Sequence, residues 1–224
     1  MTEMVIFDMD GLLLDSEQMY QRGWLKVAKN HGISLTEADM RGWSGQSASQ
    51  TMNKLAAHFG SEEIVEKMKT EREFFIAEEL AKGALQLKPY AKETLAKVKE
   101  KGLFCGLATS TLRQRGEMYL DYFQLASFFD AITFGDDVKA LKPAPEIYLK
   151  TAAKVGADPK NTIAAEDSLT GAKAAMRAGM KVVLIPDQSL PANHRNPAEI
   201  GLKPFLEGTT LKVLWDWLDT TSEK

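Results

Sequence analysis

Residues 4–11 read Met-Val-Ile-Phe-Asp-Met-Asp-Gly. An apolar run of strand length ends on two carboxylates, Asp8 and Asp10, and Gly11 closes the segment. Strands with apolar side chains on both faces are typical of parallel sheets that are covered on both sides. Open sheets of this kind bind ligands where their strands end, and side chains two residues apart in a strand point to the same side. The stretch therefore predicts a buried parallel strand that presents two acids at a ligand-binding edge.

Four further apolar runs alternate with helical patterns along the second part of the chain. The runs cover residues 103–108, 131–134, 162–165 and 181–185. The helical patterns cover residues 88–101, 112–123, 145–155, 168–178 and 210–219. Alternating strands and helices favour a parallel sheet with helices on both faces. We therefore expect an α/β fold with a Rossmann-like core.

Residues 15–84 interrupt this alternation. They show no strand pattern, and helical patterns cover residues 16–30, 36–43, 47–59 and 61–82. Thr36 and Ser61 are candidate N-caps, and the charged residues 62–73 are interpreted as a solvated helix face. A stretch of about 70 residues is far longer than an ordinary βα connection. We therefore predict a four-helix cap domain of residues 15–84 inserted into a core domain of residues 1–14 and 85–224.

The composition is that of an ordinary soluble globular protein. The chain has 224 residues, of which 44% are hydrophobic and 26% charged, and its net charge is −3. Nucleic acid and anionic membranes are therefore poor partners, and no apolar stretch reaches the roughly 18 residues that cross a bilayer. Cys105 is the only cysteine, which excludes an internal disulfide, and the amino terminus shows no secretory signal pattern. We expect a cytoplasmic protein.

Polar residues also stand at or just beyond the other predicted strand ends. They are Thr109, Ser110, Lys142, Glu166 and Asp167. Taken one at a time, such residues have ordinary structural explanations, such as helix N-caps or solvent-exposed side chains. Gathered at one edge of a sheet with two aspartates, they form the set that phosphoryl transfer to a carboxylate requires.

The reaction that suits this set uses a carboxylate as its nucleophile. A carboxylate is ionised at neutral pH and needs no base to activate it, but it repels a phosphate dianion. A divalent cation removes that repulsion, with Lys142 and the Thr109 hydroxyl on the remaining phosphoryl oxygens. Oxygen ligands such as Asp8 and Asp167 favour Mg²⁺. The sequence therefore predicts Mg²⁺ as the cofactor and a small phosphorylated metabolite as the partner.

Over essentially its whole length the chain resembles haloacid dehalogenase superfamily phosphatases with a helical cap after the first strand. The motifs that carry the resemblance are Asp8-Met9-Asp10-Gly11, Thr109, Lys142 and Glu166-Asp167. The resemblance is to the β-phosphoglucomutase-like, sugar phosphatase branch, and it implies hydrolysis of a small phosphomonoester. It implies that Asp8 is the nucleophile, which forms an aspartyl-phosphate, and that Asp10 is the general acid and base.

The same resemblance assigns the metal and phosphate ligands. The Mg²⁺ site would comprise Asp8, Asp10 through its main-chain carbonyl, Asp167 and, in support, Glu166. The phosphoryl oxygens would be bound by Thr109, Ser110 and Lys142.

A sugar-phosphate mutase similar to β-phosphoglucomutase is the alternative function, because it shares all four motifs. Those mutases bind a second phosphate with a His near the first cap helix and an Arg in a cap loop. The nearest positions here are Tyr20 and Gln46, which carry no positive charge. We therefore favour hydrolysis. A catalytically idle binding protein on the same scaffold is a third hypothesis, which the complete set of motifs disfavours.

Substrate specificity is expected to lie with the cap, because the core motifs contact only phosphate and metal. The candidates to face the cleft are Arg41, Trp43, Gln46, Arg113 and Arg115. Trp43 also suits packing between cap helices, and the arginines also suit a solvated surface. The sequence leaves the physiological substrate and the extent of cap opening undetermined, and we expect a monomer or a weak homodimer.

Overall fold

The computed structural model describes residues 2–43, 48–188 and 195–220, and of residues 41–43 and 48–51 it describes the secondary structure alone. At its centre is a six-stranded sheet in the order β3-β2-β1-β4-β5-β6, in which every strand pairing is parallel. The strands are β1 (Met4–Phe7), β2 (Phe104–Ala108), β3 (Ala131–Thr133), β4 (Thr162–Glu166), β5 (Lys181–Leu184) and β6 (Leu206–Glu207). The α/β fold with a Rossmann-like sheet is therefore confirmed.

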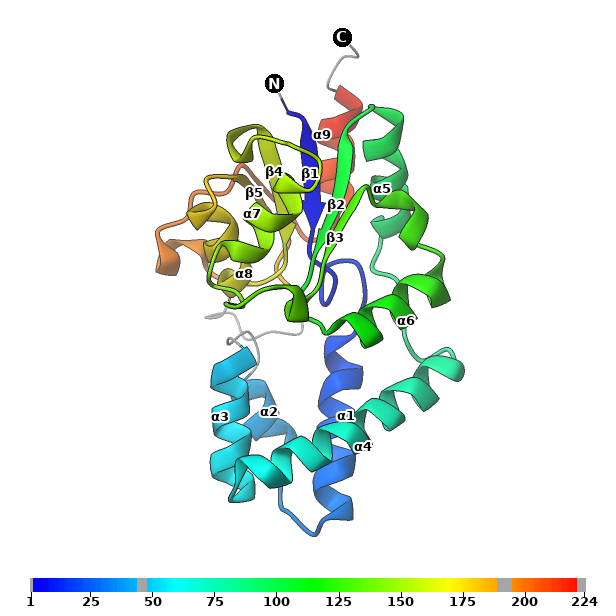
Figure 1. Ribbon diagram of the computed structural model, residues 1–224, viewed down its shortest axis with the longest axis vertical. Helices are drawn as coiled ribbons and strands as arrows, with labels where there is room; N and C mark the ends of the chain where they lie inside the picture. The colour runs from blue at the N-terminus through cyan, green and yellow to red at the C-terminus, as the bar shows by residue number, and fades with distance from the viewer. Residues whose placement is uncertain (1, 44–47, 189–194, 221–224) are drawn as a thin grey trace.

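Helices cover both faces of the sheet (Figure 1). One face carries α5 (Ala91–Glu100), α6 (Arg113–Phe123) and α9 (Lys212–Thr220), and the other carries α7 (Glu146–Ala153) and α8 (Leu169–Arg177). The short helical turns are η1 (Ala126–Phe128), η2 (Gly135–Asp137), η3 (Pro159–Asn161) and η5 (Pro197–Ile200).

The central strand β1 shows why its sequence is apolar at every position. Val5 and Phe7 belong to the hydrophobic cluster under α5, α6 and α9, whereas Met4 and Ile6 belong to the cluster under α7 and α8. Successive side chains of a strand point to opposite faces, so a strand with helices on both sides needs apolar residues throughout. β1 pairs with β2 and β4, and Asp8 follows it directly.

The sixth strand, β6, is absent from the strands predicted above. It is two residues long, with Leu206 half buried and Glu207 exposed, so no apolar run marks it. The strand exists because the chain on either side bonds to β5. The Phe205 amide donates to the Val182 carbonyl at 2.7 Å, and the Gly208 amide donates to the Leu184 carbonyl at 3.1 Å. The other five strands match the predicted runs to within one residue at each end.

Four helices lie between β1 and α5, and we call them the cap helices. They are α1 (Glu17–Asn30), α2 (Glu37–Trp43), α3 (Ala48–Phe59) and α4 (Glu62–Ala81). They bury a hydrophobic cluster of their own, in which Trp24 packs at a ring-centroid distance of 6.2 Å from Phe59. The carboxyl ends of the sheet strands face these helices (Figure 1). The division into two domains at residues 14/15 and 84/85 stays a prediction.

The predicted N-caps of two cap helices are present in the structure. The Ser61 hydroxyl accepts a hydrogen bond from the Ile64 amide at 3.2 Å. At the start of α2, the Asp39 amide donates to the Thr36 hydroxyl at 3.2 Å, and the Thr36 amide donates to the Asp39 carboxylate at 2.9 Å. Such bonds satisfy amides that have no partner within the helix. None of the helices within the described ranges has the length and apolar character needed to cross a membrane.

The chain enters and leaves the cap helices along two connections that lie side by side. The Asp15 amide donates to the Gln86 carbonyl at 2.9 Å, and the Lys88 amide donates to the Leu13 carbonyl at 2.8 Å. The Lys88 ammonium lies 2.9 Å from the Asp15 carboxylate and 3.6 Å from that of Asp187, in the loop after β5. Both connections are therefore held at the end of the sheet where Asp8 lies.

Candidate active site

Asp8 stands at the carboxyl end of the central strand and is almost completely buried. Its side chain and backbone together are 7% exposed. The Asp8 amide donates to the Ala165 carbonyl of β4 at 3.0 Å, which fixes the residue against the neighbouring strand. Burial raises the pKa of Asp8 from 3.8 to about 7, against the lowering effect of the Lys142 ammonium. A carboxylate in such a place needs cations around it in order to stay ionised.

Lys142 supplies one of those cations. Its Nζ lies 2.5 Å from Asp8 Oδ1, 2.7 Å from Glu166 Oε1 and 2.8 Å from the Ala108 carbonyl oxygen. Burial by itself would lower the pKa of Lys142, but the two carboxylates outweigh it and raise the pKa above its ordinary value. The ammonium is therefore charged at neutral pH and is held between the ends of β1, β2 and β4.

Glu166, the last residue of β4, is fully buried and positions that lysine. Besides Lys142, its Oε1 accepts a hydrogen bond from the Tyr148 hydroxyl at 2.5 Å, and its Oε2 accepts one from the Ser168 hydroxyl at 3.2 Å. Helix α8 passes so close that a Cβ on Gly171 would lie 1.8 Å from Oε1. Glu166 is thus held on every side, and only glycine fits at the facing position of α8.

Asp167 follows Glu166 and completes a cluster of three acids. Side-chain oxygens of Asp8, Glu166 and Asp167 lie within 4.8 Å of one another. Burial, followed by the charges of Glu166 and Asp8, raises the pKa of Asp167 well above its ordinary value. If all three acids were ionised, one ammonium would leave two negative charges unbalanced in a buried place, which is unfavourable without a further cation.

A magnesium ion suits this cluster in both charge and chemistry. One divalent cation would balance the two excess charges, and carboxylate oxygens are its preferred ligands. Gly11, with a φ of +81°, packs so close to the acids that a Cβ there would lie 2.2 Å from Asp167 Oδ2, so only glycine fits beside them. The residues present at this edge of the sheet therefore fit Mg²⁺.

The Asp10 side chain lies in different surroundings, among hydroxyl groups. Ser16 Oγ donates to its Oδ1 at 2.7 Å and Thr111 Oγ1 donates to its Oδ2 at 2.6 Å, while Thr109 Oγ1 lies 3.5 Å from Oδ2. The carboxylate is therefore held from both sides, and it is not one of the three acids that make up the cluster of Asp8, Glu166 and Asp167. The involvement of the Asp10 carbonyl in metal binding stays a prediction.

The two hydroxyl residues predicted to bind phosphate follow β2. Thr109 is 1% exposed, and its amide donates to the Thr133 carbonyl of β3 at 3.1 Å. Ser110 is half buried, and its carbonyl oxygen would lie 2.3 Å from a Cβ on Gly135. Both residues therefore lie at the same sheet edge as Asp8, and their role in phosphate binding stays a prediction.

Three residues that contact the predicted site residues escaped the sequence analysis: Ser16, Thr111 and Tyr148. In the sequence, Ser16 is indistinguishable from an ordinary residue at a helix start, and Thr111 is one of three consecutive hydroxyl residues, 109–111. Tyr148 falls on the buried face of an ordinary amphipathic helix. No local pattern distinguishes these positions, because each contacts a partner that is distant in sequence or across a turn.

Among the predicted specificity residues, Arg113 and Arg115 have described side chains. Arg113 is half exposed and pairs with Asp137 at 2.7 Å and Glu117 at 3.2 Å. Arg115 is 10% exposed and pairs with Glu73 of α4 at 2.6 Å. Gln46 lies outside the described residues, and so do the side chains of Arg41 and Trp43. A role in specificity stays a prediction for all five.

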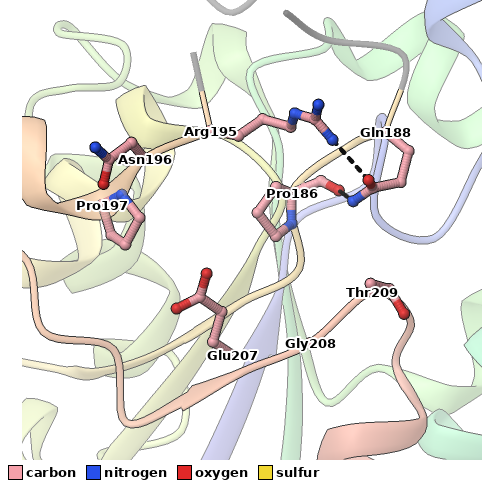
Figure 2. Close-up of a pocket in the computed structure, with 8 residues that line it drawn as sticks. All are labelled: Pro186, Gln188, Arg195, Asn196, Pro197, Glu207, Gly208 and Thr209. Carbon is pink, nitrogen blue, oxygen red and sulfur yellow. Dashed lines mark hydrogen bonds between the residues drawn. The ribbon is translucent and has the colours of Figure 1, made fainter. Parts of the chain in front are cut away.

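The described residues also line a cavity of about 430 Å³ between the loop after β5 and the strand β6. Its lining is Pro186, Gln188, Arg195, Asn196, Pro197, Glu207, Gly208 and Thr209 (Figure 2). Figure 2 shows the Arg195 guanidinium bonded to the Gln188 side chain, at 2.6 Å. None of the lining residues belongs to the acid and hydroxyl groups described above, but Pro186 and Gln188 flank Asp187, whose amide donates to the Asp167 carbonyl at 3.4 Å.

Comparison with known proteins agrees with the geometry. A family model described as haloacid dehalogenase-like hydrolase matches residues 5–185. Hexitol phosphatase B of Escherichia coli is 32% identical over 232 aligned positions, which cover 93% of this chain and 95% of that protein. The phosphorylated carbohydrates phosphatase of Thermotoga maritima is 34% identical over 179 positions, which cover 80% of this chain and 82% of that protein.

A solved structure shows the same fold. The crystal structure of CbbY from Rhodobacter sphaeroides in complex with phosphate superposes with a TM-score of 0.81 over 96% of each chain. The two sequences are 21% identical, so the likeness concerns the architecture.

Proposed function

Because the chain belongs to the haloacid dehalogenase-like hydrolase family and is a phosphoric monoester hydrolase, we propose that it removes phosphate from a small phosphorylated carbohydrate through an aspartyl-phosphate on Asp8. The observation that carries the proposal is the arrangement around that residue. A buried aspartate lies 2.5 Å from an ammonium and shares a cluster with two further acids. The names of the relatives, which act on hexitol phosphates or phosphorylated carbohydrates, support the substrate class.

In the first half of the reaction, an Asp8 carboxylate oxygen attacks phosphorus and the bond from phosphorus to the ester oxygen breaks. Asp10 gives its proton to that oxygen, so the product leaves as an alcohol rather than as an alkoxide. Lys142 and the Thr109 hydroxyl offset the negative charge on the phosphoryl oxygens. The phosphoryl group is now on Asp8, and Asp10 is ionised.

In the second half, Asp10 takes a proton from water and the resulting hydroxide oxygen attacks phosphorus. The bond to Asp8 breaks, which restores its carboxylate and releases inorganic phosphate. The Ser16 and Thr111 hydroxyls, which donate to the two oxygens of Asp10, hold its carboxylate in place between the two half-reactions. Asp10 ends the cycle protonated, as it began.

Magnesium would be held by Asp8, Asp167 and the main-chain carbonyl of Asp10, with Glu166 in support. When bound, it supplies positive charge that offsets the repulsion between a carboxylate and a phosphate dianion. Glu166 also helps to offset this repulsion, because its hydrogen bond keeps the Lys142 ammonium beside Asp8.

The proposal is tested with a panel of phosphomonoesters that includes hexitol, hexose, glycerol and nucleoside phosphates. We expect Mg²⁺-dependent release of inorganic phosphate, fastest from a carbohydrate or sugar alcohol ester, and loss of that release in EDTA. Interconversion of hexose phosphates with little phosphate release would identify a mutase instead, and no reaction with any ester would contradict both. The monomer or weak homodimer and the cytoplasmic location stay predictions.

A further inference from the structure

Asp10 is connected to the cap helices by a short series of side-chain contacts. Thr111 Oγ1 donates to Asp10 Oδ2 at 2.6 Å, and the same oxygen accepts a hydrogen bond from Arg115 Nη2 at 3.3 Å. On its other side, Arg115 Nη1 donates to Glu73 Oε1 at 2.6 Å. Glu73 belongs to α4 of the cap helices, whereas Thr111 and Arg115 belong to the loop after β2 and the first turn of α6.

The contact from Arg115 decides where the Thr111 proton points. A hydroxyl has a single proton, and its oxygen accepts through its lone pairs. Arg115 is a donor with no acceptor atoms, so a bond from Arg115 occupies the oxygen of Thr111 and leaves the proton free for Asp10. A donor that carries charge also polarises the hydroxyl, which strengthens the second bond in the series. Thr111 is 5% exposed, so bulk water does not compete freely for either bond.

The surroundings of Arg115 fix its own position. Its guanidinium carbon lies 5.0 Å from the centre of the Tyr20 ring, and its side chain is 10% exposed. Arg72 contacts the same ring, with its guanidinium carbon 4.1 Å from the ring centre, and it also donates to Glu73. One carboxylate, Glu73, is therefore shared by two arginines, and Asp10 is a further carboxylate whose charge acts on Arg115.

We propose that Arg115 is a positioning residue: it sets the direction of the Thr111 hydroxyl, and that hydroxyl holds the Asp10 carboxylate in place for proton transfer. The inference rests on the proposed role of Asp10 as acid and base. Among the described contacts, Arg115 touches neither Asp8 nor Lys142, so it would assist proton transfer without contacting the residues proposed to bind the phosphoryl group. Replacement of Arg115 should lower kcat and leave KM unchanged. Loss of an interaction that acts only in the transition state lowers kcat, whereas loss of ground-state binding raises KM.

The first test replaces Arg115 by Met, which keeps an unbranched stem and removes the donors. With the best substrate of the panel at saturating Mg²⁺, we expect kcat to fall about tenfold, since small misplacements of a catalytic group cost one to two orders of magnitude. KM should stay within about twofold of the native value. Arg22→Met is the matched control, because Arg22 is half exposed and lies 3.9 Å from Glu79, within the cap helices; it should leave both constants unchanged.

The second test asks whether Arg115 acts through Thr111. Thr111→Val removes the hydroxyl at nearly constant shape, and we expect a loss of kcat at least as large as that of Arg115→Met. In the Thr111→Val protein, the further change Arg115→Met should cost nothing more, because the group it orients is already missing. Thr111→Ser restores a hydroxyl and should recover most of the native kcat. Independent, multiplying losses in the double variant would overturn the inference.

Thermal unfolding of each variant separates a folding defect from a positioning defect. If Arg115→Met does not fold, Arg115→Leu takes its place, because leucine also removes every donor while it keeps an apolar side chain, so kcat should still fall with KM unchanged. A native kcat in a folded Arg115 variant, or a loss confined to KM, contradicts the inference. Failure of the proposed function is distinct, because the native protein itself would then release no phosphate.

Discussion

Asp8 and Asp10 are separated by one residue in the chain, yet their side chains lie in opposite kinds of surroundings. Asp8 is buried among charges, with an ammonium at 2.5 Å and two further acids beside it. Asp10 is held by neutral hydroxyls at both of its oxygens. This difference in partners fits the proposed division of tasks, in which Asp8, beside the ammonium, is the nucleophile and Asp10, between hydroxyls, transfers protons.

Substitution of the two aspartates should separate these tasks. We expect Asp8→Asn to abolish turnover, because an amide cannot accept and release the phosphoryl group. Asp10→Asn should slow turnover by at least about a hundredfold, the usual scale of acid–base catalysis. Phosphate release at saturating substrate and Mg²⁺ measures both. Substantial Mg²⁺-dependent activity in Asp8→Asn would contradict the assignment of the nucleophile.

The pKa of Asp8 also predicts how stability depends on pH in the absence of metal. Burial raises that pKa from 3.8 to about 7, so between these values the native protein holds a proton that the unfolded chain has released. Stability from this group is therefore present at low pH and is lost as the pH rises through the interval. Asparagine cannot ionise, so the stability of Asp8→Asn relative to native should increase from about pH 4 to about pH 7 and then level off.

Urea unfolding of both proteins in EDTA at several pH values gives this difference directly. The native protein measured beside the variant cancels the contribution of titrating groups that do not interact with Asp8. A difference that does not change with pH would contradict the raised pKa.

The residues proposed to carry the chemistry are those whose place at the sheet edge the sequence predicts best. Asp8, Lys142 and Asp167 stand just beyond strand ends or before a helix, and in parallel strands such positions meet at one edge. Tyr148 and Thr111, which hold Glu166 and Asp10, could not be identified in this way. A tyrosine on the buried face of a helix looks the same in sequence whether it packs against leucine or bonds to a buried glutamate.

At the scale of elements, the close approach of α8 to Glu166 makes Gly171 a sensitive position. The helix begins at Leu169, after the N-cap Ser168, whose hydroxyl accepts a bond from the Gly171 amide at 3.1 Å. Because a Cβ there would lie 1.8 Å from Glu166 Oε1, Gly171→Ala has to displace the helix or the carboxylate.

We therefore expect Gly171→Ala to destabilise the protein by about 1–3 kcal/mol, the usual cost of overpacking, and to lower kcat. Denaturant unfolding measures the first effect, and phosphate release measures the second. Gly156→Ala is the control for a glycine at a helix end, because a Cβ on Gly156 meets no atom within 4 Å, although its φ of +72° carries a strain cost of its own. It should leave kcat unchanged, and a native kcat in Gly171→Ala would show that Glu166 tolerates displacement.

Periodic patterns predicted the helices and all but one of the strands, because each buries a regular apolar face. The interpretation of residues 62–73 as a solvated face was wrong at Arg72, which is 4% exposed. Its stem crosses α1 at Gly23, and its guanidinium carbon lies 4.5 Å from the centre of the Trp24 ring. A charged residue can be buried when aromatic faces and a carboxylate receive it, and a pattern of polarity carries no information about such partners.

At the scale of the whole molecule, the cap helices stand over the strand ends while part of their surface packs into the core. Met19 of α1 and Ile76 and Leu80 of α4 belong to the same hydrophobic cluster as Phe7. Helices α1 and α4 thus share apolar packing with the sheet, so we expect a change in charge balance at the three acids to alter the stability of the whole protein.

Magnesium should therefore stabilise the whole protein as well as support turnover. We expect the unfolding temperature to rise with Mg²⁺ concentration, because a ligand that binds only the folded state adds about 2.7 kcal/mol at a hundred times its Kd. EDTA should reverse the rise and abolish turnover. In Asp167→Asn the rise should be much smaller, whereas Asp216→Asn, at a half-exposed pair with Lys212 on α9, should behave as native. KCl at equal ionic strength controls for screening, and an equal rise in KCl would contradict specific binding.

The adjacency of the two connections at Leu14 and Leu87 makes the helical insert exchangeable. Because its ends are already bonded to each other, another insert with neighbouring ends could be grafted there without moving the catalytic edge, and loop-closure entropy would rise only slowly with the length of the graft. Exchange of the segment between Leu14 and Leu87 would then change substrate selectivity and leave the proposed catalytic residues of the core in place.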